Sequence, residues 1–384
     1  MAHNLPLSRL GVVGGGQLAR MLAPACHAHH VELTILDPEV KSPAGQVAGS
    51  QIVGALHDPE ALKALCQVSD VVTFDLENIG ADILMTLAEA GVQMVPSPAV
   101  VRLIQNKLHQ KQHYQTHGLP STQFMPLPAD ADFSCVQAFG LPCVQKACMG
   151  GYDGRGVHVI RNESDWQRRL PVDSFVEAFV PQALELAVMV ARNASGEMVA
   201  YDPVEMVVDP DLNLLRYLLA PARVSAEVAR AAVALAQQTV ASFSTEGLFG
   251  VELFVTESGE LLVNEVAPRA HNSGHHTIEA CVTSQFENQL RACLNLPLGQ
   301  TDLRGCALTM NFVGAEGYQG APVVEGLEEL LKQSDVHVHL YGKSECRPGR
   351  KMGHVTIIGD NQDALIAWYE RTCNDVQIRG AERL

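Results

Sequence analysis

The sequence predicts an α/β protein that begins with a doubly wound parallel sheet and continues into a strand-rich region. Apolar strands alternate with amphipathic helices over residues 10–96, which is typical of parallel sheets. After residue 118 hairpin patterns replace that alternation. The length of 384 residues favours two or three domains.

Composition restricts the class of protein. With 47% hydrophobic and 18% charged residues the chain is typical of a soluble globular protein, and no run approaches the roughly 18 apolar residues of a membrane helix. The net charge of −16 would repel nucleic acid. Ten cysteines without a C-x-x-C pair indicate reduced thiols. The first ten residues lack the apolar core of a signal peptide, so we expect a cytoplasmic protein that binds neither membranes nor nucleic acid.

The N-terminal elements follow in order. Strands are predicted at residues 10–13, 31–37, 70–76 and 92–96, and helices at 18–30 and 80–91. Glu77 marks the end of the third strand. Because ligands bind at the carboxyl ends of such strands, we expect a site at that edge.

A helix over residues 99–118 begins after Ser97 as N-cap and Pro98 at its first position. The next elements are a hairpin over 141–162, strands over 175–181 and 184–193, a turn at 193–196, a helix over 225–243, a hairpin over 249–268 and a helix over 277–294. A β-rich end closes with a helix over 363–373.

The stretch "MGGYDGRGV" places Gly150, Gly151, Gly154 and Gly156 between two strands. Asp-Gly alone is a common hairpin turn, but a tight turn does not need four glycines. Bare backbone can lay its N–H groups against phosphate oxygens, and Lys146 on the incoming strand can neutralise them. The loop is neither a Walker A motif nor part of a protein-kinase signature, so we expect another kind of nucleoside triphosphate site.

Two carboxylates face each other across the hairpin over 249–268. Its turn places Glu252 opposite Glu265, which is unfavourable unless a cation lies between them. Mg²⁺ typically takes one or two carboxylates together with phosphate oxygens, and Asn264 is adjacent. The alternative is a solvated hairpin with two unrelated glutamates.

Two further segments are candidate anion sites. "APRAHNSGHHT" gathers Arg269 and the histidines 271, 275 and 276 before a helix N-terminus, a pattern that fits an anion better than a metal. "KSECRPGRKMGH" holds Lys343, Arg347, Arg350 and Lys351. A basic run is often only a solvated surface, but in an acidic chain we favour a phosphate or carboxylate pocket.

The N-terminal glycines allow two interpretations. Gly14, Gly16 and Ala19, with Asp37 further on, match the dinucleotide fingerprint of a Rossmann NADP-dependent oxidoreductase. The same turn, with Gln17 at the helix start and Glu77 near the ribose, also fits the single phosphate of a ribonucleotide. We favour the second interpretation because nothing downstream suits hydride transfer.

Taken together, "GGGQLARM", "LENI", "PSPAVVRLIQNK", Lys146 four residues before "GGYDGRG", "VNEVAPRAHNSGH" and "RPGRKMGH" resemble the ATP-grasp superfamily. Within it they resemble the 5-(carboxyamino)imidazole ribonucleotide synthases, from about Leu10 to about Trp368. The resemblance implies an N-terminal pre-ATP-grasp domain over 1–104, an ATP-grasp domain over 105–300 with a hairpin lid at about 121–190, and a small β-rich domain over 301–384. It also implies a homodimer.

The resemblance implies roles for individual residues. ATP is assigned to Lys107, Lys146, Gly150, Gly151, Tyr152, Asp153, Gly154, Arg155, Gly156, Glu177, Ala178, Phe179, Val180, Glu185, Asn264 and Glu265. Mg²⁺, with Mn²⁺ as an alternative, is assigned to Glu252 and Glu265. The other substrates are assigned to Gln17, Leu18, Glu77, Tyr152, Arg155, Arg269, His271, Asn272, Ser273, Lys343, Arg350 and Lys351. The implied catalytic residues are Lys146, Asp153, Arg155, Arg269 and His271.

The implied reaction is ATP- and bicarbonate-dependent N5-carboxylation of 5-aminoimidazole ribonucleotide (AIR) in purine biosynthesis. Alternatives are a formate-dependent glycinamide ribonucleotide transformylase, a biotin carboxylase or a non-catalytic nucleotide-binding module. The sequence departs from the usual pattern at Lys107, Cys148 and Met149, where Arg, Arg and Thr are common. An insertion near residues 202–211 leaves Glu205 without an assigned role.

Overall fold

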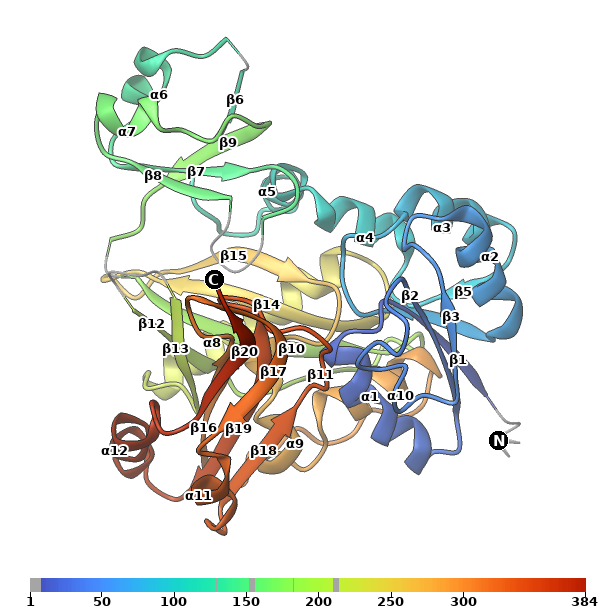
Figure 1. Cartoon of the computed structure of the whole chain (residues 1–384). Coiled ribbons are helices and arrows are strands. Elements are labelled where there is room, and N and C mark those ends of the chain that lie inside the picture. Colours follow the sequence, from blue (N-terminus) through green and yellow to red (C-terminus); the bar gives the residue numbers. More distant parts are fainter. Residues whose placement is uncertain (1–7, 129, 152–155, 182, 210–213) are drawn as a thin grey trace.

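The computed structural model describes residues 8–384 except 129, 152–155, 182 and 210–213. Figure 1 shows an N-terminal α/β part beside a large central sheet, with a smaller sheet projecting above it. Three C-terminal strands continue the central sheet, and two others pair in a separate sheet. The site must therefore be sought where these parts meet.

The N-terminal part is a parallel sheet, as predicted, and has five strands in the order β3-β2-β1-β4-β5. Its strands are β1 (Arg9–Val13), β2 (Glu32–Asp37), β3 (Ser50–Val53), β4 (Val71–Phe74) and β5 (Gln93–Met94). We did not predict β3, because its four residues are half polar. The predicted strand over 70–76 is shorter than expected, so Glu77 lies three residues beyond the end of β4.

Three helices accompany this sheet: α1 (Gln17–Ala28), α2 (Pro59–Val68) and α3 (Ala81–Glu89). Asp58 caps α2 by accepting a hydrogen bond from the Glu60 N–H, and Pro59 occupies the first position. The apolar face of α1 shares one hydrophobic core with β10 and α10, which belong to the central part. This core fixes the parallel sheet against the central sheet.

The predicted helix over 99–118 is wrong in one respect, because it is two helices, α4 (Pro98–Gln105) and α5 (Lys107–Thr116). Asn106 adopts an extended backbone between them, and its side chain accepts hydrogen bonds from the N–H groups of Leu108 and His109. Pro98 begins α4 as expected, but the Ser97 side chain makes no capping hydrogen bond. The break turns Lys107 out of the line of α4.

The projecting sheet is antiparallel, with the order β6-β9-β7-β8. Its elements are β6 (Phe124–Leu127), α6 (Phe133–Phe139), β7 (Cys143–Ala147), β8 (Val157–Ile160), α7 (Glu163–Gln167) and β9 (Ser174–Ala178). The pairing of β7 with β8 confirms the hairpin predicted over 141–162. Its small separate core contains Val136, Ile160 and Trp166.

The central sheet has nine strands, in the order β15-β14-β10-β12-β13-β16-β19-β18 with β11 paired to β10. They are β10 (Leu184–Arg192), β11 (Met198–Ala200), β12 (Val204–Asp209), β13 (Leu214–Ala220), β14 (Gly247–Val255), β15 (Leu261–Ala267), β16 (Cys306–Val313), β18 (Val336–Leu340) and β19 (Lys351–Gly359). Strands from both sides of residue 300 thus share one sheet. The domain boundaries at 104/105 and 300/301 remain proposals.

The other elements complete the chain. They are α8 (Ala226–Ser242), η1 (Asn272–Gly274), α9 (Thr277–Ala280), α10 (Gln285–Cys293), β17 (Tyr318–Glu325), α11 (Leu327–Leu331), α12 (Gln362–Thr372) and β20 (Gln377–Arg383). The single helix predicted over 277–294 is wrong. Cys281 leaves the helical path to bridge Leu303, and Ser284 caps the new helix α10. The predicted closing helix matches α12 within one residue.

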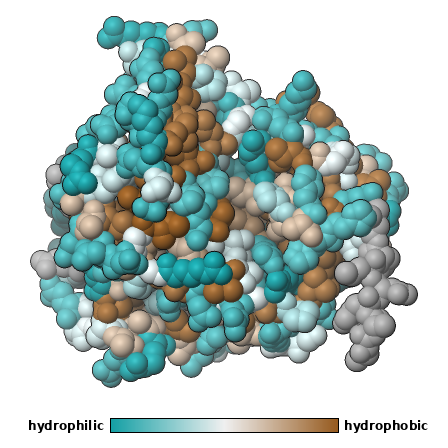
Figure 2. All heavy atoms as spheres, turned by 90° about the horizontal axis from the view of Figure 1, so that it is seen from below, coloured by the Kyte–Doolittle hydropathy of each residue, from teal (hydrophilic) through white to brown (hydrophobic). Residues whose placement is uncertain are grey.

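Figure 2 shows polar residues over much of the face seen from below, with apolar residues gathered in patches between them. Within the described ranges no helix is both long and apolar enough to span a bilayer. Seven of the ten cysteines, all of them unpaired in the structure, are buried.

Candidate active site

The N-terminal glycine turn lies at the carboxyl end of β1. The Gly14 N–H donates to the Leu36 carbonyl oxygen (2.8 Å), and its φ of 97° is strained for any residue with a side chain. A Cβ there would lie 2.2 Å from Leu76 Cδ2. Glycine is thus required for the chain to pass from β1 into α1.

Two carboxylates accept hydrogen bonds from backbone N–H groups of this turn. Asp37 Oδ2 accepts from the Gly15 N–H (2.7 Å), while Asp75 accepts from the N–H groups of Gly16 (3.0 Å) and Ala19 (2.6 Å). A dinucleotide pyrophosphate would need these donors, so the geometry argues against the Rossmann interpretation. Gln17 and Leu18 are the first two residues of α1.

Glu77 joins the parallel sheet to the central part. Arg269 Nε lies 2.7 Å from Glu77 Oε2. Burial alone would raise the pKa of Glu77, but Arg269 outweighs it and lowers the pKa to about 2. Gln105 Nε2 donates to the carbonyl oxygens of Glu77 (2.5 Å) and Ile79 (2.9 Å), which fixes the loop that carries the carboxylate.

The two predicted carboxylates do face each other at the edge of the central sheet. Glu252 on β14 pairs in register with Glu265 on β15, as expected. The register then shifts to Leu253 opposite Val263, so Asn264 is the additional residue of a β-bulge. The bulge turns the Asn264 amide toward Glu252, with Nδ2 3.4 Å from Oε2.

Lys146 reaches this hairpin from β7 of the projecting sheet. Its Nζ donates to Asn264 Oδ1 (2.8 Å) and lies 2.6 Å from Glu177 Oε1. The other oxygen of Glu177 accepts from Lys111 (2.9 Å) and Thr122 (2.7 Å). The buried Glu177 carboxylate, which the resemblance assigned to ATP, thus holds two lysines.

Charge in this cluster is concentrated and buried. Burial would raise the pKa of Glu177, but Lys146 and Lys111 outweigh it and lower the pKa to about 2. Burial lowers the pKa of Lys107 to about 8, with Lys146 as the next cause. Lys107 forms an ion pair with Glu265, so an ammonium group and any bound cation would compete for that carboxylate.

Glu185 lies on β10 beside the same cluster. Burial, followed by the charge of Glu252, raises its pKa to about 7 against the opposing effect of Lys146. A carboxylate with this pKa takes up or releases a proton near neutral pH. The nearby Glu205, which had no assigned role, instead accepts from the guanidinium of Arg223 (Nε 2.9 Å, Nη2 2.5 Å).

We expect Glu185→Gln to stabilise the protein at pH 8 by about 1–2 kcal/mol and to have little effect at pH 5. The folded-state pKa lies above the ordinary value of 4.5, so between these two values the folded chain binds more protons than the unfolded chain, and stability falls as the pH rises from about 4.5 to about 7. Urea unfolding at both pH values measures this difference. The exposed Glu260→Gln serves as control, and an equal effect of Glu185→Gln at both pH values would contradict the assignment.

The segment after β15 connects the carboxylates to Arg269. His271 Nε2 lies 3.4 Å from Glu252 Oε1, and His271 Nδ1 lies 2.8 Å from Ser273 Oγ. Burial lowers the pKa of His271, although Glu252 opposes the shift. Among the described residues, neither polar atom of the buried Asn272 amide has a hydrogen-bond partner. Asn272 therefore offers an unused donor and acceptor beside His271.

The basic loop, residues 341–351, leads from β18 into β19. Lys343 Nζ donates to the Lys351 carbonyl oxygen (2.6 Å), and Arg350 Nη1 donates to that of Glu345 (2.8 Å). These contacts gather the three predicted cations on one loop. His275 and His276, also singled out in the sequence, are fully buried, and burial lowers the pKa of both.

The glycine-rich loop is described only at its ends. Gly150 and Gly156 have positive φ values of 75° and 81°, as its bare backbone suggested. Tyr152, Asp153, Gly154 and Arg155 lie outside the described residues. Ala178 ends β9 and donates its N–H to the Gln123 carbonyl oxygen (2.9 Å), while Phe179 is exposed and Val180 follows it.

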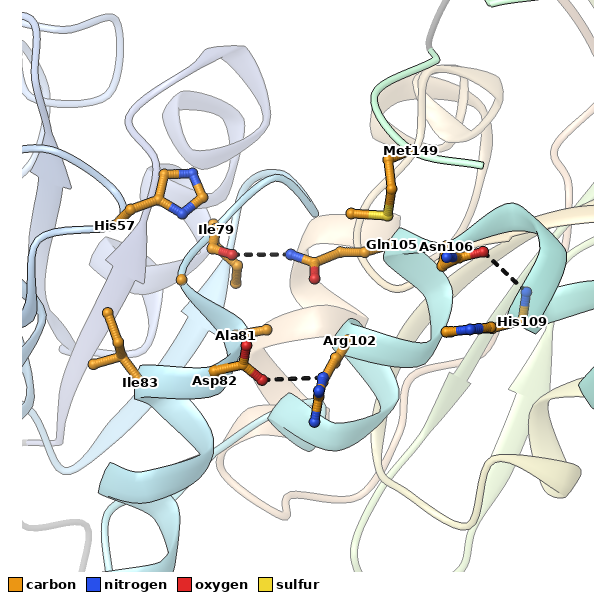
Figure 3. A pocket seen from close by; sticks show the side chains of 11 residues that line it. His57, Ile79, Ala81, Asp82, Ile83, Arg102, Gln105, Asn106, His109 and Met149 are labelled. Atoms are coloured by element: carbon orange, nitrogen blue, oxygen red, sulfur yellow. Dashed lines mark hydrogen bonds and ion pairs between the residues drawn. The ribbon is translucent and has the colours of Figure 1, made fainter. Parts of the chain in front are cut away.

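A cavity of about 450 Å³ opens beside this site, between α3 and the junction of α4 with α5 (Figure 3). The dashed lines in Figure 3 show Gln105 bonded to Ile79 and Arg102 paired with Asp82. No motif pointed to this cavity, because its walls come from four separate segments. Its lining residues are His57, Ile79, Gly80, Ala81, Asp82, Ile83, Arg102, Gln105, Asn106, His109 and Met149.

Comparison with known proteins agrees with this arrangement. Residues 7–105 match the ribonucleotide synthetase preATP-grasp domain, residues 112–286 the ATP-grasp domain, and residues 307–367 the phosphoribosylaminoimidazole carboxylase C-terminal domain. The N5-carboxyaminoimidazole ribonucleotide synthase of Synechococcus elongatus is 38% identical over 358 residues, covering 92% of this chain and 90% of that protein.

Solved structures show the same fold. The crystal structure of N5-carboxyaminoimidazole ribonucleotide synthetase from Thermotoga maritima matches with a TM-score of 0.90 and 41% identity, covering 97% of this chain and 99% of that one. The Aspergillus clavatus synthase in complex with ADP and AIR matches with a TM-score of 0.85 and 31% identity, covering 95% of this chain and 99% of that one.

Fold and site together define an ATP-grasp protein, in which lysines from a small projecting sheet meet carboxylates at the edge of a larger sheet. Proteins of this class include ligase-type enzymes that use ATP. Because the chain is 38% identical to the Synechococcus protein over nine-tenths of its length, it belongs to the N5-carboxyaminoimidazole ribonucleotide synthase family.

Proposed function

We propose that the chain carboxylates AIR on N5, using ATP and bicarbonate and releasing ADP and phosphate, in de novo purine biosynthesis. One observation carries this proposal. Ion pairs and hydrogen bonds run from Glu177 through Lys146, Asn264 and Glu252 to His271. Arg269, two residues before His271, pairs with Glu77 at the edge of the parallel sheet. Groups suited to a triphosphate thus adjoin groups suited to a ribonucleotide.

The reaction needs an activated carboxyl group, because bicarbonate is a poor electrophile. A bicarbonate oxygen attacks the γ-phosphorus of ATP, the bond to ADP breaks, and carboxyphosphate forms. The exocyclic amine of AIR then attacks the carboxyl carbon and phosphate leaves, while the amine loses a proton. We assign acceptance of that proton to Asp153, which precedes Arg155 by two positions in the sequence.

Residues of the chain have separate tasks in this scheme. Lys146 offsets charge on the phosphoryl group. Lys107 lies near Lys146 and adds a second positive charge. Arg269, His271 and Asn272 hold bicarbonate and its adduct; the unpartnered Asn272 amide supports this assignment. To the glycine-rich loop over 150–156, whose residues 152–155 lie outside the described part of the chain, we assign the task of keeping water from carboxyphosphate.

We propose Mg²⁺ at Glu252 and Glu265, with Mn²⁺ as an alternative. The donor set fits: two carboxylates and an amide are hard oxygen ligands, and Mg²⁺ usually takes one or two carboxylates together with phosphate oxygens. When bound, the ion would neutralise phosphate charge. Lys107 would have to release Glu265, as its ion pair with that carboxylate indicates.

The decisive experiment measures ADP release from ATP, bicarbonate and AIR, with each component omitted in turn. We expect sustained release only with all three. Sustained release with glycinamide ribonucleotide and formate, or with biotin, would instead support another ATP-grasp ligase. We also propose that the protein is a homodimer, and light scattering would test this through the molar mass. We propose a cytoplasmic location as well, because ten free thiols fit a reducing compartment.

Arg350→Ala should raise the KM for AIR by about 10- to 100-fold and leave the KM for ATP nearly unchanged. The reason is the loss of a charge-assisted contact with the ribonucleotide phosphate. Steady-state ADP release with each substrate varied measures both constants. Arg371→Ala, an exposed arginine on α12 and outside the basic loop, is the control. An equal rise in both KM values would contradict the assignment.

A further inference from the structure

The connection between β2 and β3 touches two parts of the proposed ribonucleotide site. On one side it packs against the glycine turn, where the Ala44 N–H donates to the Gly15 carbonyl oxygen (2.9 Å). A Cβ at Gly15 would lie 2.3 Å from Ser42 Oγ, so the two segments are in close contact. We call residues 39–46 the clasp.

On its other side the clasp holds the basic loop. Gln46 Nε2 donates to the Gly342 carbonyl oxygen (2.7 Å), and the Ser344 hydroxyl donates to the Glu39 carboxylate. These residues are separated by about 300 positions in the sequence. The clasp therefore joins the glycine turn of the parallel sheet to the basic loop of the C-terminal part.

Contacts from α1 fix the direction of the Gln46 amide. Arg20 Nη1 donates to Gln46 Oε1 (3.3 Å) and to the Pro43 carbonyl oxygen (2.8 Å). Gln46 Nε2 also donates to the Lys41 carbonyl oxygen (3.1 Å). Since Arg20 lies three residues after Gln17, it is on the face of α1 next to the proposed phosphate contacts.

The point of attachment on the basic loop has little freedom. Gly342 has a φ of 70°, and a Cβ there would lie 2.6 Å from Gln46 Oε1. The next residue is Lys343, whose ammonium donates to the Lys351 carbonyl oxygen. The hydrogen bond to the Gly342 carbonyl therefore fixes the backbone position of Lys343, and through Lys343 that of Lys351.

We propose that Gln46 is a positioning residue for the ribonucleotide phosphate, and this inference rests on the proposed function. It fixes the spacing between the N-terminus of α1 and the cations of the basic loop. A phosphate group bound by both needs that spacing to stay constant, because charge-assisted hydrogen bonds weaken as their distance grows. Gln46 itself does not touch the phosphate.

The test compares Gln46→Ala and Gln46→Glu in the full chain. The Glu variant keeps an acceptor for Arg20 but loses the donor to Gly342. We expect both variants to raise the KM for AIR by about three- to tenfold, with kcat and the KM for ATP unchanged. Calorimetric titration with AIR should show the same loss of affinity.

Gln362→Ala is the matched control, because Gln362 Nε2 also donates to a loop carbonyl, that of Pro221 (2.5 Å), and Gln362 follows the end of β19 opposite to the basic loop. It should leave the KM for AIR unchanged. If Gln46→Glu keeps wild-type affinity, contact with Arg20 suffices and the proposal is wrong. Equal changes in kcat and both KM values would indicate a merely structural role. A wild-type chain that releases no ADP with AIR would refute the proposed function instead.

Discussion

Glu265→Gln should lower the kcat for ADP release by at least about 100-fold and change stability little. Glu265 faces Glu252 across the β-bulge, and its carboxylate is one of the two charges proposed to hold Mg²⁺. The amide keeps the size of the side chain and removes the charge. A partly exposed side chain at a sheet edge tolerates this change in the folded state.

The measurement is ADP release at saturating ATP, bicarbonate and AIR over a range of Mg²⁺ concentrations, together with thermal unfolding. Glu257→Gln makes the same chemical change at an exposed position of the same hairpin and should behave as wild type. Wild-type turnover by Glu265→Gln would remove the metal assignment. Partial recovery at high Mg²⁺ would support it.

The second large effect concerns stability. Lys111→Met should lower the free energy of unfolding by about 3–5 kcal/mol. The Lys111 side chain is 2% exposed and lies 2.9 Å from the buried Glu177 carboxylate. Without it, one buried carboxylate oxygen keeps only the hydroxyl of Thr122 as a partner.

Urea unfolding at pH 7 measures this loss. Lys63→Met on the exposed surface of α2 is the control and should change stability by less than about 0.5 kcal/mol. A loss below about 1 kcal/mol for Lys111→Met would show that Glu177 is satisfied without it. Because Glu177 also holds Lys146, the KM for ATP should rise in the same variant.

Local patterns predicted much of the fold. The parallel sheet, the β7–β8 hairpin and the facing pair Glu252 and Glu265 follow from residue alternation and turn chemistry, which depend on neighbours in the sequence. The break at Asn106 was missed, since its flanking residues favour helix on both sides. It is fixed by a side-chain cap and by the hydrogen bond from the Lys107 N–H to the Cys148 carbonyl oxygen.

Other features of the site depend on distant partners. Lys111 lies in the polar stretch "KLHQKQHY", which gives no sign of burial; it is buried by contacts with distant segments, among them Glu177 on β9 and Val263 on β15. The resemblance singled out Glu177, but it did not predict the ion pairs of Glu177 with two lysines. Asp75 had no motif either, and it meets the glycine turn because β1 and β4 are neighbours.

The continuous central sheet restricts how this protein can be divided. Leu218, Leu219 and Ala220 of β13 pair with Thr309, Leu308 and Ala307 of β16. A chain truncated at residue 300 would expose this row as an unpaired, apolar edge, which recruits strands from other molecules. Such a fragment should aggregate on expression even though its proposed nucleotide residues are intact. The C-terminal strand β16 therefore covers the edge of the ATP-grasp sheet at β13, and the same C-terminal part also supplies the basic loop.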